Sequence, residues 1–488
     1  MKIKSIKVNA TLNVIKQIFT ILFPMITVYY ATRILGKENY GNVNYVKSIT
    51  SYFTLFAGLG VSTYAVREGG YLRENKQKYS KFASEIYTLN ILSTFTSFVL
   101  LLVFSYLYKN NIAGWNELIL IFSLTMLLTT IGADWVNTTF EDFLYITIRY
   151  IFFYFISFVA LFLFVRGEED YLVYACIIVL SSVGGNILNI FYIRRYVKLK
   201  LVPLRLTVKH LKRILILFSS NIAATIYINS DTTMIGAISG PKEVAVYTVA
   251  SNIYIAVKQI SNSAITVVMP RMSHLISNSL LEEHKVLVNK IISYVFVLLI
   301  PASIGVYFLS NHLMNFMGGL EYSEGANALR ILSLTLVIAS INYVISRSVT
   351  LPYKEDKLYF ISTAVSAIVN ICLNFVLLPI FSYTGAALTT LISEIIVFIF
   401  LYNNSKRYIN LEFITMDSIK VILSSLLVSI VCFWTTNYLI IDRIYLIFIS
   451  IILSFFVYII ALILLKHSII EDVKAMLILR KRKKRKLV

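Results

Sequence analysis

Long apolar runs alternate with short polar loops along the whole chain. Each run has about 20 residues, the length that an α-helix needs to cross the hydrocarbon core of a bilayer. No loop between two runs is longer than about twenty residues, so the pattern leaves no room for a folded domain outside the membrane. We therefore predict an all-α polytopic membrane protein with fourteen transmembrane helices. The runs cover approximately residues 9–32, 42–65, 83–107, 117–138, 147–165, 171–193, 214–236, 244–268, 290–310, 326–348, 358–378, 385–403, 420–438 and 445–465.

The composition excludes a water-soluble enzyme. Of the 488 residues, 58% are hydrophobic and 14% are charged, and the mean hydropathy is +0.76. Soluble domains carry about a quarter charged residues and just under half apolar ones. The three cysteines fall inside apolar runs and show no metal-ligand spacing, which favours packing roles.

Basic residues are concentrated on one set of alternate loops. These loops and the two chain ends carry 34 Lys and Arg residues, whereas the loops of the opposite side carry six. Because positive charge marks cytoplasmic loops, we expect both termini in the cytoplasm and an even number of spans. This asymmetry accounts for most of the net charge of +20. The basic tail at 480–486 is expected to touch anionic lipid headgroups, and no nucleic-acid partner is expected.

Two short sequence segments recur six spans apart. Residues 35–49 align with residues 240–253, and EDFLYI at 141–146 matches EDKLYF at 355–360. An even separation gives both copies the same orientation, which predicts two six-helix lobes related by an axis along the membrane normal. The predicted parts are an N-terminal lobe with its linker at 1–213, a C-terminal lobe at 214–419, and two further helices with the basic tail at 420–488.

Three lysines lie inside the predicted spans, where a charge is costly unless it faces a polar interior or a partner. Lys16 belongs to a polar stripe of helical period on the first span, and Lys47 lies in the outer half of the second span. Lys258 lies near the middle of the eighth span among serine, tyrosine and amide side chains. Together they predict a cationic substrate cavity. The alternatives are that Lys16 snorkels to the interface and that Lys258 belongs to a structural ion pair.

A second set of polar side chains carries oxygen ligands. Asp231 lies in the seventh span and Glu394 in the twelfth, with Thr390 one turn before Glu394. Asn370 and Asn374 in the eleventh span share a helix face. Carboxylate, amide and hydroxyl oxygens suit a proton or a small hard cation such as sodium, so this set is a candidate for ion coupling. The alternative is a hydrogen-bonded network that holds helices together.

Several motifs are absent from the sequence. It contains no phosphate-binding loop of the GxxxxGK[ST] type, so an ATP-driven pump on this chain is not expected. It contains no HExxH, and the five histidines are scattered. No set of residues suggests catalysis, and we expect neither an enzyme nor a bound cofactor.

Three segments resemble one family of transporters. RILGKENYGNV at 33–43 resembles the LGxxxYG turn between the first two helices of polysaccharide transporters. ADWVNTTFEDFLYITIR at 133–149 is similar to their DWxxxGxExFxYITIR segment, although Thr138 or Thr139 stands where glycine is common. IGAISGPKEVAVYTVASNI is similar to the turn before the eighth span. Over nearly its whole length the chain resembles the Wzx-type O-antigen and capsule repeat-unit flippases of the MATE-like MOP superfamily.

The resemblance implies a function and a location. It implies two six-helix lobes around a cavity that opens alternately to each side of the bacterial cytoplasmic membrane. The implied substrate is an undecaprenyl-diphosphate-linked oligosaccharide that moves between leaflets, driven by an ion gradient or the membrane potential. A polysaccharide polymerase and chain-length regulators are the protein partners that this setting suggests.

The resemblance also bears on the candidate sites. Related flippases of lipid-linked precursors carry cavity cations on helices one, two and eight, which implies substrate roles for Lys16, Lys47 and Lys258. Their sodium site uses an Asp on helix seven with polar residues on helices eleven and twelve, which matches Asp231 in type. This chain has Asn374 where an acid is typical, so Glu394 would have to supply the missing charge.

Two alternative functions stay open at this point. A multidrug or cation antiporter of the same fold would need an acidic cavity in the first lobe, and the lysines of helices one and two argue against it. A membrane enzyme of polysaccharide assembly is the alternative of a different class.

Overall fold

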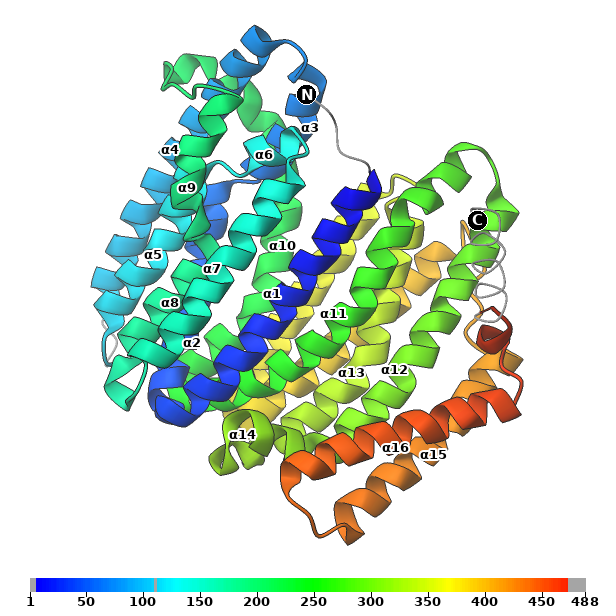
Figure 1. Cartoon of the computed structure of the whole chain (residues 1–488). Helices are drawn as coiled ribbons and strands as arrows, with labels where there is room; N and C mark the ends of the chain where they lie inside the picture. The colour runs from blue at the N-terminus through cyan, green and yellow to red at the C-terminus, as the bar shows by residue number, and fades with distance from the viewer. Residues whose placement is uncertain (1–5, 109–111, 473–488) are drawn as a thin grey trace, which may run out of the picture. The chain divides into compact units, whose positions relative to one another are not determined.

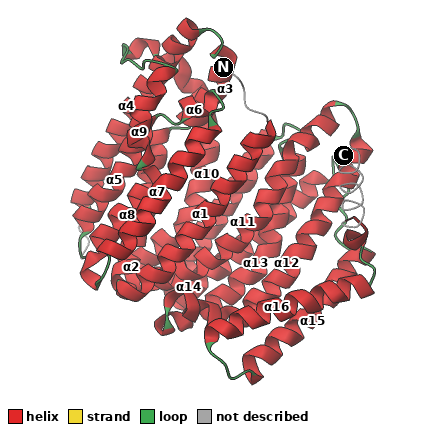
Figure 2. Ribbon diagram, in the orientation of Figure 1, coloured by secondary structure: helices red, strands yellow, loops and turns green. Residues whose placement is uncertain are grey.

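The computed structural model describes residues 6–108 and 112–472, without the side chains of residues 6–18 and of a few positions in α10 and α11. All regular structure in these ranges is helical, and they contain no strand (Figure 2). The fourteen apolar runs are helical over most of their lengths, and three of them, 42–65, 117–138 and 171–193, cross a break between two helices. The predicted all-α class is therefore confirmed.

The helices divide between two compact units. Unit 1 comprises Met1–Thr248 and Ala367–Tyr383, and unit 2 comprises Val249–Ser366 and Thr384–Val488. The lobe boundaries predicted from the sequence repeat stay predictions, because compactness alone does not define the moving parts of a transporter.

Unit 1 is a bundle of long helices in which α4, α5, α8 and α7 lie side by side (Figure 1). Short helical turns join the long helices in this bundle. The unit also holds the first turns of α11 and the middle of α14. Its elements are α1 (Ile6–Ile34), α2 (Gly36–Gly58), α3 (Val61–Leu72), α4 (Lys76–Leu107), α5 (Trp115–Gly132), α6 (Trp135–Thr139), α7 (Phe143–Phe164), η1 (Glu168–Asp170), α8 (Tyr171–Val183), α9 (Gly185–Tyr192), η2 (Ile193–Arg195), η3 (Leu204–Leu206) and α10 (Val208–Ile238).

Unit 2 is built on α12, which packs against α13, α15 and α16. The last two helices form an antiparallel pair (Figure 1). A π-helical turn follows α13. The elements are α11 (Pro241–Ser277), α12 (Leu281–Gly318), η4 (Leu320–Gly325), α13 (Ala326–Ile345), η5 (Ser346–Thr350), α14 (Asp356–Ser405), α15 (Met416–Tyr438) and α16 (Arg443–Leu464).

The number of membrane spans stays a prediction. Among the described residues, ten helices are long and apolar enough to cross a membrane, or eleven if the bent pair within α10 counts as one span. The eleventh and twelfth predicted runs share α14, which is kinked at Ser382, where φ is 48° and ψ is −135°. Length and composition alone therefore give a lower number than the fourteen runs.

Two glycines let the helices around the first candidate site approach closely. A Cβ atom on Gly41 of α2 would lie 1.9 Å from the carbonyl oxygen of Pro241. A Cβ atom on Gly236 of α10 would lie 2.1 Å from Cδ2 of Tyr45 on α2. The first turn of α11 and the end of α10, the helix that carries Asp231, are thereby held against α2.

Candidate substrate and ion sites

The first candidate site gathers around Asp231 of α10 in unit 1. Its side chain is buried, with 6% exposed. The Tyr247 hydroxyl donates to Oδ2 at 2.5 Å, and the side-chain amides of Asn370 and Asn374 donate to Oδ1 at 3.0 and 2.8 Å. The Ser230 hydroxyl donates to Oδ1 of Asn370 at 2.7 Å. The structure thus brings together three of the predicted ion ligands, from α10 and α14.

The residues of this cluster donate hydrogen bonds to the Asp231 carboxylate, and their oxygens could also serve as ligands of a cation. As drawn, the two amides act as donors to Asp231, which is the hydrogen-bonded network that the sequence left open. Turning either amide over would present its oxygen beside the carboxylate, and carboxylate, amide and hydroxyl oxygens suit a hard cation. The residues therefore fit a sodium ion or a proton at Asp231.

The other two predicted ion ligands belong to unit 2. Thr390 and Glu394 lie one turn apart on α14, and each is 6% exposed. The Glu394 carboxylate accepts a hydrogen bond at 2.6 Å from Nδ2 of Asn342 on α13, and it lies 3.5 Å from the Lys258 ammonium. Glu394 is therefore the ion-pair partner of a residue predicted to bind substrate.

The side chain of Lys258 on α11 is mostly buried, and a part of it stays accessible. Its side chain is 22% exposed. Nζ donates to the Tyr254 hydroxyl at 3.1 Å and lies 5.2 Å from the centre of that ring. A Lys inside an apolar helix is thus held by one acid and one tyrosine, with part of its surface accessible. This arrangement fits the ion-pair alternative, and the accessible part leaves room for an anionic ligand.

Of the other two lysines predicted to bind substrate, the structure describes the side chain of Lys47 only. Lys47 on α2 is exposed, although its neighbours Val46 and Ser48 are buried. Within the described ranges, its ammonium makes no hydrogen bond or ion pair. The side chain of Lys16 lies outside the described residues. Lys47 is therefore an exposed cation within a long helix, and its role in substrate binding stays a prediction.

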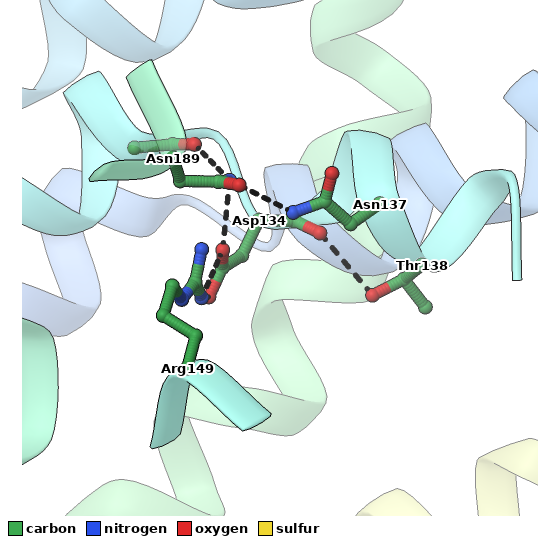
Figure 3. Close-up of polar contacts among 6 residues, drawn as sticks. Asp134, Asn137, Thr138, Arg149 and Asn189 are labelled. Atoms are coloured by element: carbon green, nitrogen blue, oxygen red, sulfur yellow. Dashed lines mark hydrogen bonds and ion pairs between the residues drawn. The ribbon is translucent and has the colours of Figure 1, made fainter. Parts of the chain in front are cut away.

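A second polar network occupies the segment 133–149 of unit 1 (Figure 3). The Arg149 guanidinium of α7 donates from Nη2 to both carboxylate oxygens of Asp134 at 2.6 Å, and its side chain is 2% exposed. Asn189 of α9 donates to Oδ1 of Asp134 at 2.9 Å and to the Gly132 carbonyl at 2.6 Å. Asn137 donates to Asn189 at 2.6 Å. The network ties the break between α5 and α6 to α7 and α9.

A tyrosine pair extends this network. The hydroxyls of Tyr192 and Tyr196 both donate to Oδ2 of Asp142, at 2.5 and 2.7 Å. Burial, and then the hydrogen bond to Asp142, raises the pKa of Tyr196 to about 12. Arg73 pairs with Glu141 at 2.7 Å. Tyr196 therefore stays protonated near neutral pH and keeps donating to Asp142, which favours a fixed structural role.

Sequence reasoning missed several partners of the polar residues in these sites. It did not single out Asn189, Asn342 or Tyr247. The signal for the two asparagines is an amide inside an otherwise apolar run, because such a group needs a partner in the membrane. Tyr247 gave no comparable signal, since tyrosine is common in this sequence.

The comparison with protein families decides what the chain is. The model of the family described as "Polysaccharide biosynthesis protein" matches residues 6–276, which is more than half of the chain. The chain belongs to the polysaccharide biosynthesis protein family. A MatE family model also matches residues 217–376. The predicted membership in this transporter superfamily is therefore confirmed.

One curated relative of this polysaccharide biosynthesis protein covers part of its length. The chain is 25% identical over 174 residues to the probable low-salt glycan biosynthesis flippase Agl15 of Haloferax volcanii. The match takes in 36% of this chain and 37% of the relative, so it spans just over a third of that protein.

Solved structures show the same fold. The lipid II flippase MurJ in an inward closed conformation matches with a TM-score of 0.75 at 19% identity, over 93% of this chain and 99% of MurJ. An inward-facing multidrug resistance MATE transporter of the MOP superfamily matches with a TM-score of 0.64 at 15% identity, over 79% and 93%. A MOP superfamily transporter from Pyrococcus furiosus, whose binding pocket is described as reversed in polarity, matches with a TM-score of 0.59 at 14% identity, over 82% and 94%. At these identities the likeness establishes a MurJ- and MATE-like fold.

Proposed function

We propose that the chain is a flippase that moves undecaprenyl-diphosphate-linked oligosaccharide repeat units across the bacterial cytoplasmic membrane. The observation that carries the proposal is Lys258, a cation kept inside an apolar helix and 22% exposed. A diphosphate that leaves the headgroup region needs positive partners, because an unpaired charge in hydrocarbon is costly. Family membership and the flippase named among the relatives support the same reading.

Lys258 binds the diphosphate by exchanging partners. In the described state its ammonium lies 3.5 Å from the Glu394 carboxylate. A phosphate oxygen that reaches Nζ takes the place of this carboxylate, and Glu394 is then a buried acid without its cation. Asn342, which donates to Glu394 at 2.6 Å, keeps the carboxyl in position. Lys47, an exposed lysine of unit 1, keeps the substrate-binding role that the sequence predicts for it.

Ion coupling takes place at Asp231. A sodium ion or a proton there neutralises a carboxylate that is 6% exposed. Asn370 and Asn374 turn their amides according to whether the site holds a cation, since an amide serves as donor or acceptor. The distribution of basic loops favours a cytoplasmic location for both termini.

Complementation tests the proposal. A strain that lacks its own repeat-unit flippase accumulates lipid-linked units on the cytoplasmic side, and this chain should restore surface polysaccharide. Failure to restore it, together with export of cationic drugs, would support a multidrug antiporter instead. Cleavage or formation of glycosidic bonds by the purified protein would support the enzyme alternative.

A further inference from the structure

A groove of about 400 Å³ runs along α4 in unit 1. Its walls come from α4 between Leu89 and Leu100, from the end of α2 at Phe56, and from the segment Leu204–Leu211 at η3 and the start of α10. Several wall residues are well exposed, among them Leu92 at 45% and Leu100 at 54%. The volume falls within the range of ligand-binding pockets, which is about 300–1,000 Å³.

The surface of the groove is apolar, although some of its wall residues carry hydroxyl groups. Ser93 donates to the carbonyl of Ala57 and Ser97 to that of Phe53, both at 2.6 Å. Thr96 donates to the carbonyl of Leu92 at 3.0 Å. Because each hydroxyl is bonded to backbone, the surface offers little to a polar ligand. An apolar chain is the occupant that this lining suits.

The depth of the groove matches one leaflet of a bilayer. Leu89 and Leu100 are separated by eleven residues of α4, which at about 1.5 Å per residue is roughly 16 Å. This is about half of the roughly 30 Å hydrocarbon thickness. A chain that fills the groove therefore belongs to a lipid of a single leaflet.

One end of the groove is strongly basic. The segment 194–213 carries eight Lys and Arg residues and no Asp or Glu. Arg205 follows the groove residue Leu204, and Lys212 follows Leu211, and both basic side chains are exposed. Across the described ranges, neither side chain makes an ion pair. Lys209 is also exposed, and it lies 2.9 Å from the buried Glu85. Two of these cations are thus available to an anion at the mouth of the groove.

We propose that this groove binds an anionic phospholipid, with one acyl chain along α4 and the phosphate at Arg205 and Lys212. The apolar wall selects a hydrocarbon chain, the depth selects a lipid of one leaflet, and the basic end selects a negative headgroup. A polyprenyl carrier is much longer than one leaflet is deep, so the phospholipid is the better match. The site is separate from the residues proposed for transport, because neither Lys258 nor Asp231 lines it.

The test compares lipids with identical acyl chains on the purified full-length protein. Native mass spectrometry counts phosphatidylglycerol and phosphatidylcholine that stay bound in mild detergent. Each Lys or Arg near an anionic headgroup contributes about 1 kcal/mol, so two of them predict roughly thirty-fold tighter binding of phosphatidylglycerol. The double variant Arg205→Gln/Lys212→Gln should lose this preference. Lys76→Gln/Lys78→Gln, which removes two exposed charges outside the groove lining, should keep it.

A second variant tests the groove itself. Thr96→Phe fills the groove and should lower phosphatidylglycerol binding at least tenfold, whereas Val99→Phe, on an exposed position of the same helix outside the lining, should not. Equal binding of both lipids by the unaltered protein would overturn the proposal, because an ordinary boundary lipid would then explain the groove. Displacement of phosphatidylglycerol by a polyprenyl phosphate whose own binding is lost in Thr96→Phe would also overturn it in favour of the carrier. The charge variant alters only exposed side chains, so its result does not depend on how Thr96→Phe folds.

Discussion

Lys258 of α11 and Glu394 of α14 form an ion pair inside unit 2, with Nζ 3.5 Å from Oε1. The acid is 6% exposed and is anchored by Asn342, whereas the lysine side chain is 22% exposed. The pair is therefore fixed on its acidic side and accessible on its basic side. An anionic ligand can therefore contact the Lys258 ammonium more readily than the buried Glu394 carboxylate.

The stability of this pair can be separated from its role in transport. Lys258→Gln leaves a buried carboxylate without its cation, and Glu394→Gln leaves a partly exposed ammonium without its acid. Loss of one partner of a buried pair costs about 3 kcal/mol, whereas replacing both partners is close to neutral. We expect each single variant to unfold at a lower temperature in detergent and Lys258→Gln/Glu394→Gln to recover most of the loss. Additive losses in the double variant would show that the two residues do not interact.

Gly41 is predicted to tolerate no side chain. A Cβ atom at this position would lie 1.9 Å from the backbone oxygen of Pro241, so Gly41→Ala must displace the first turn of α11. Gly58 at the end of the same helix has no atom within 4 Å of its Cβ position. We expect Gly41→Ala to lower the unfolding temperature and Gly58→Ala to be neutral or stabilising by up to about 1 kcal/mol. Equal behaviour of the two variants in a thermal unfolding assay would contradict the close approach of α2 and α11.

The Asp134–Arg149 pair is predicted to act as a structural clamp. Arg149→Ala removes a guanidinium that is 2% exposed and leaves Asp134 with Asn189 as its side-chain donor. The loss should be about 3 kcal/mol, because the carboxylate stays partly buried without its cation. Arg149→Lys should recover only part of it, since an ammonium cannot reproduce the guanidinium geometry. Unfolding in detergent measures both variants, and wild-type stability of Arg149→Ala would exclude the clamp.

Ion coupling is predicted to depend on the charge of Asp231. Asp231→Asn keeps the size of the side chain and removes the charge that a cation or proton neutralises. Transport in vesicles should then lose its dependence on sodium and pH. Tyr247→Phe removes a hydrogen bond to the same carboxylate and keeps the acid, so it serves as the control that retains ion dependence. Transport by the unaltered protein that is indifferent to both sodium and pH would rule out coupling at Asp231.

The end of the described chain is predicted to loosen in acid. Lys290 donates to Asp472 at 2.7 Å, and this hydrogen bond holds the pKa of the Asp472 carboxyl below its usual value of about 3.9. Stabilisation from a lowered carboxyl pKa is complete above the unfolded value and is lost as the pH falls through the folded value. Hydrogen exchange of the segment around Asp472, corrected for intrinsic rates, should therefore increase below about pH 4. In Asp472→Asn it should be fast at every pH, and unchanged protection in that variant would show that the contact does not hold the segment.

Much of the fold follows from the sequence, because the bilayer imposes one length and one periodicity on every span. Each of the fourteen apolar runs is helical over most of its length. The kink at Ser382 is different, since its positive φ depends on how the two halves of α14 pack. The spacing of Asn370 and Asn374 predicted their shared face, and both amides do meet Asp231.

The ion-pair partner of Glu394 could not be predicted from the spacing of residues in the sequence. Its position in an apolar run shows that it needs a partner, and both a cation in solution and a lysine satisfy that need. The choice depends on the rotation of α11 against α14, which is set by side-chain packing along both helices. The sequence therefore identified Lys258 and Glu394 as charges inside spans. It assigned Lys258 to the substrate and Glu394 to the coupling ion.

The most direct test of the proposed function is the flipping of a polyprenyl-diphosphate-linked glycan by the purified protein in vesicles. A charge-assisted hydrogen bond from Lys258 to phosphate is worth about 2–3 kcal/mol, so Lys258→Gln should lower the flipping rate about 30- to 150-fold. Lys258→Arg should retain a substantial part of the rate, and Lys242→Gln, which removes an exposed lysine, should match the unaltered protein. A Lys258→Gln variant that folds and flips at the unaltered rate would contradict the account.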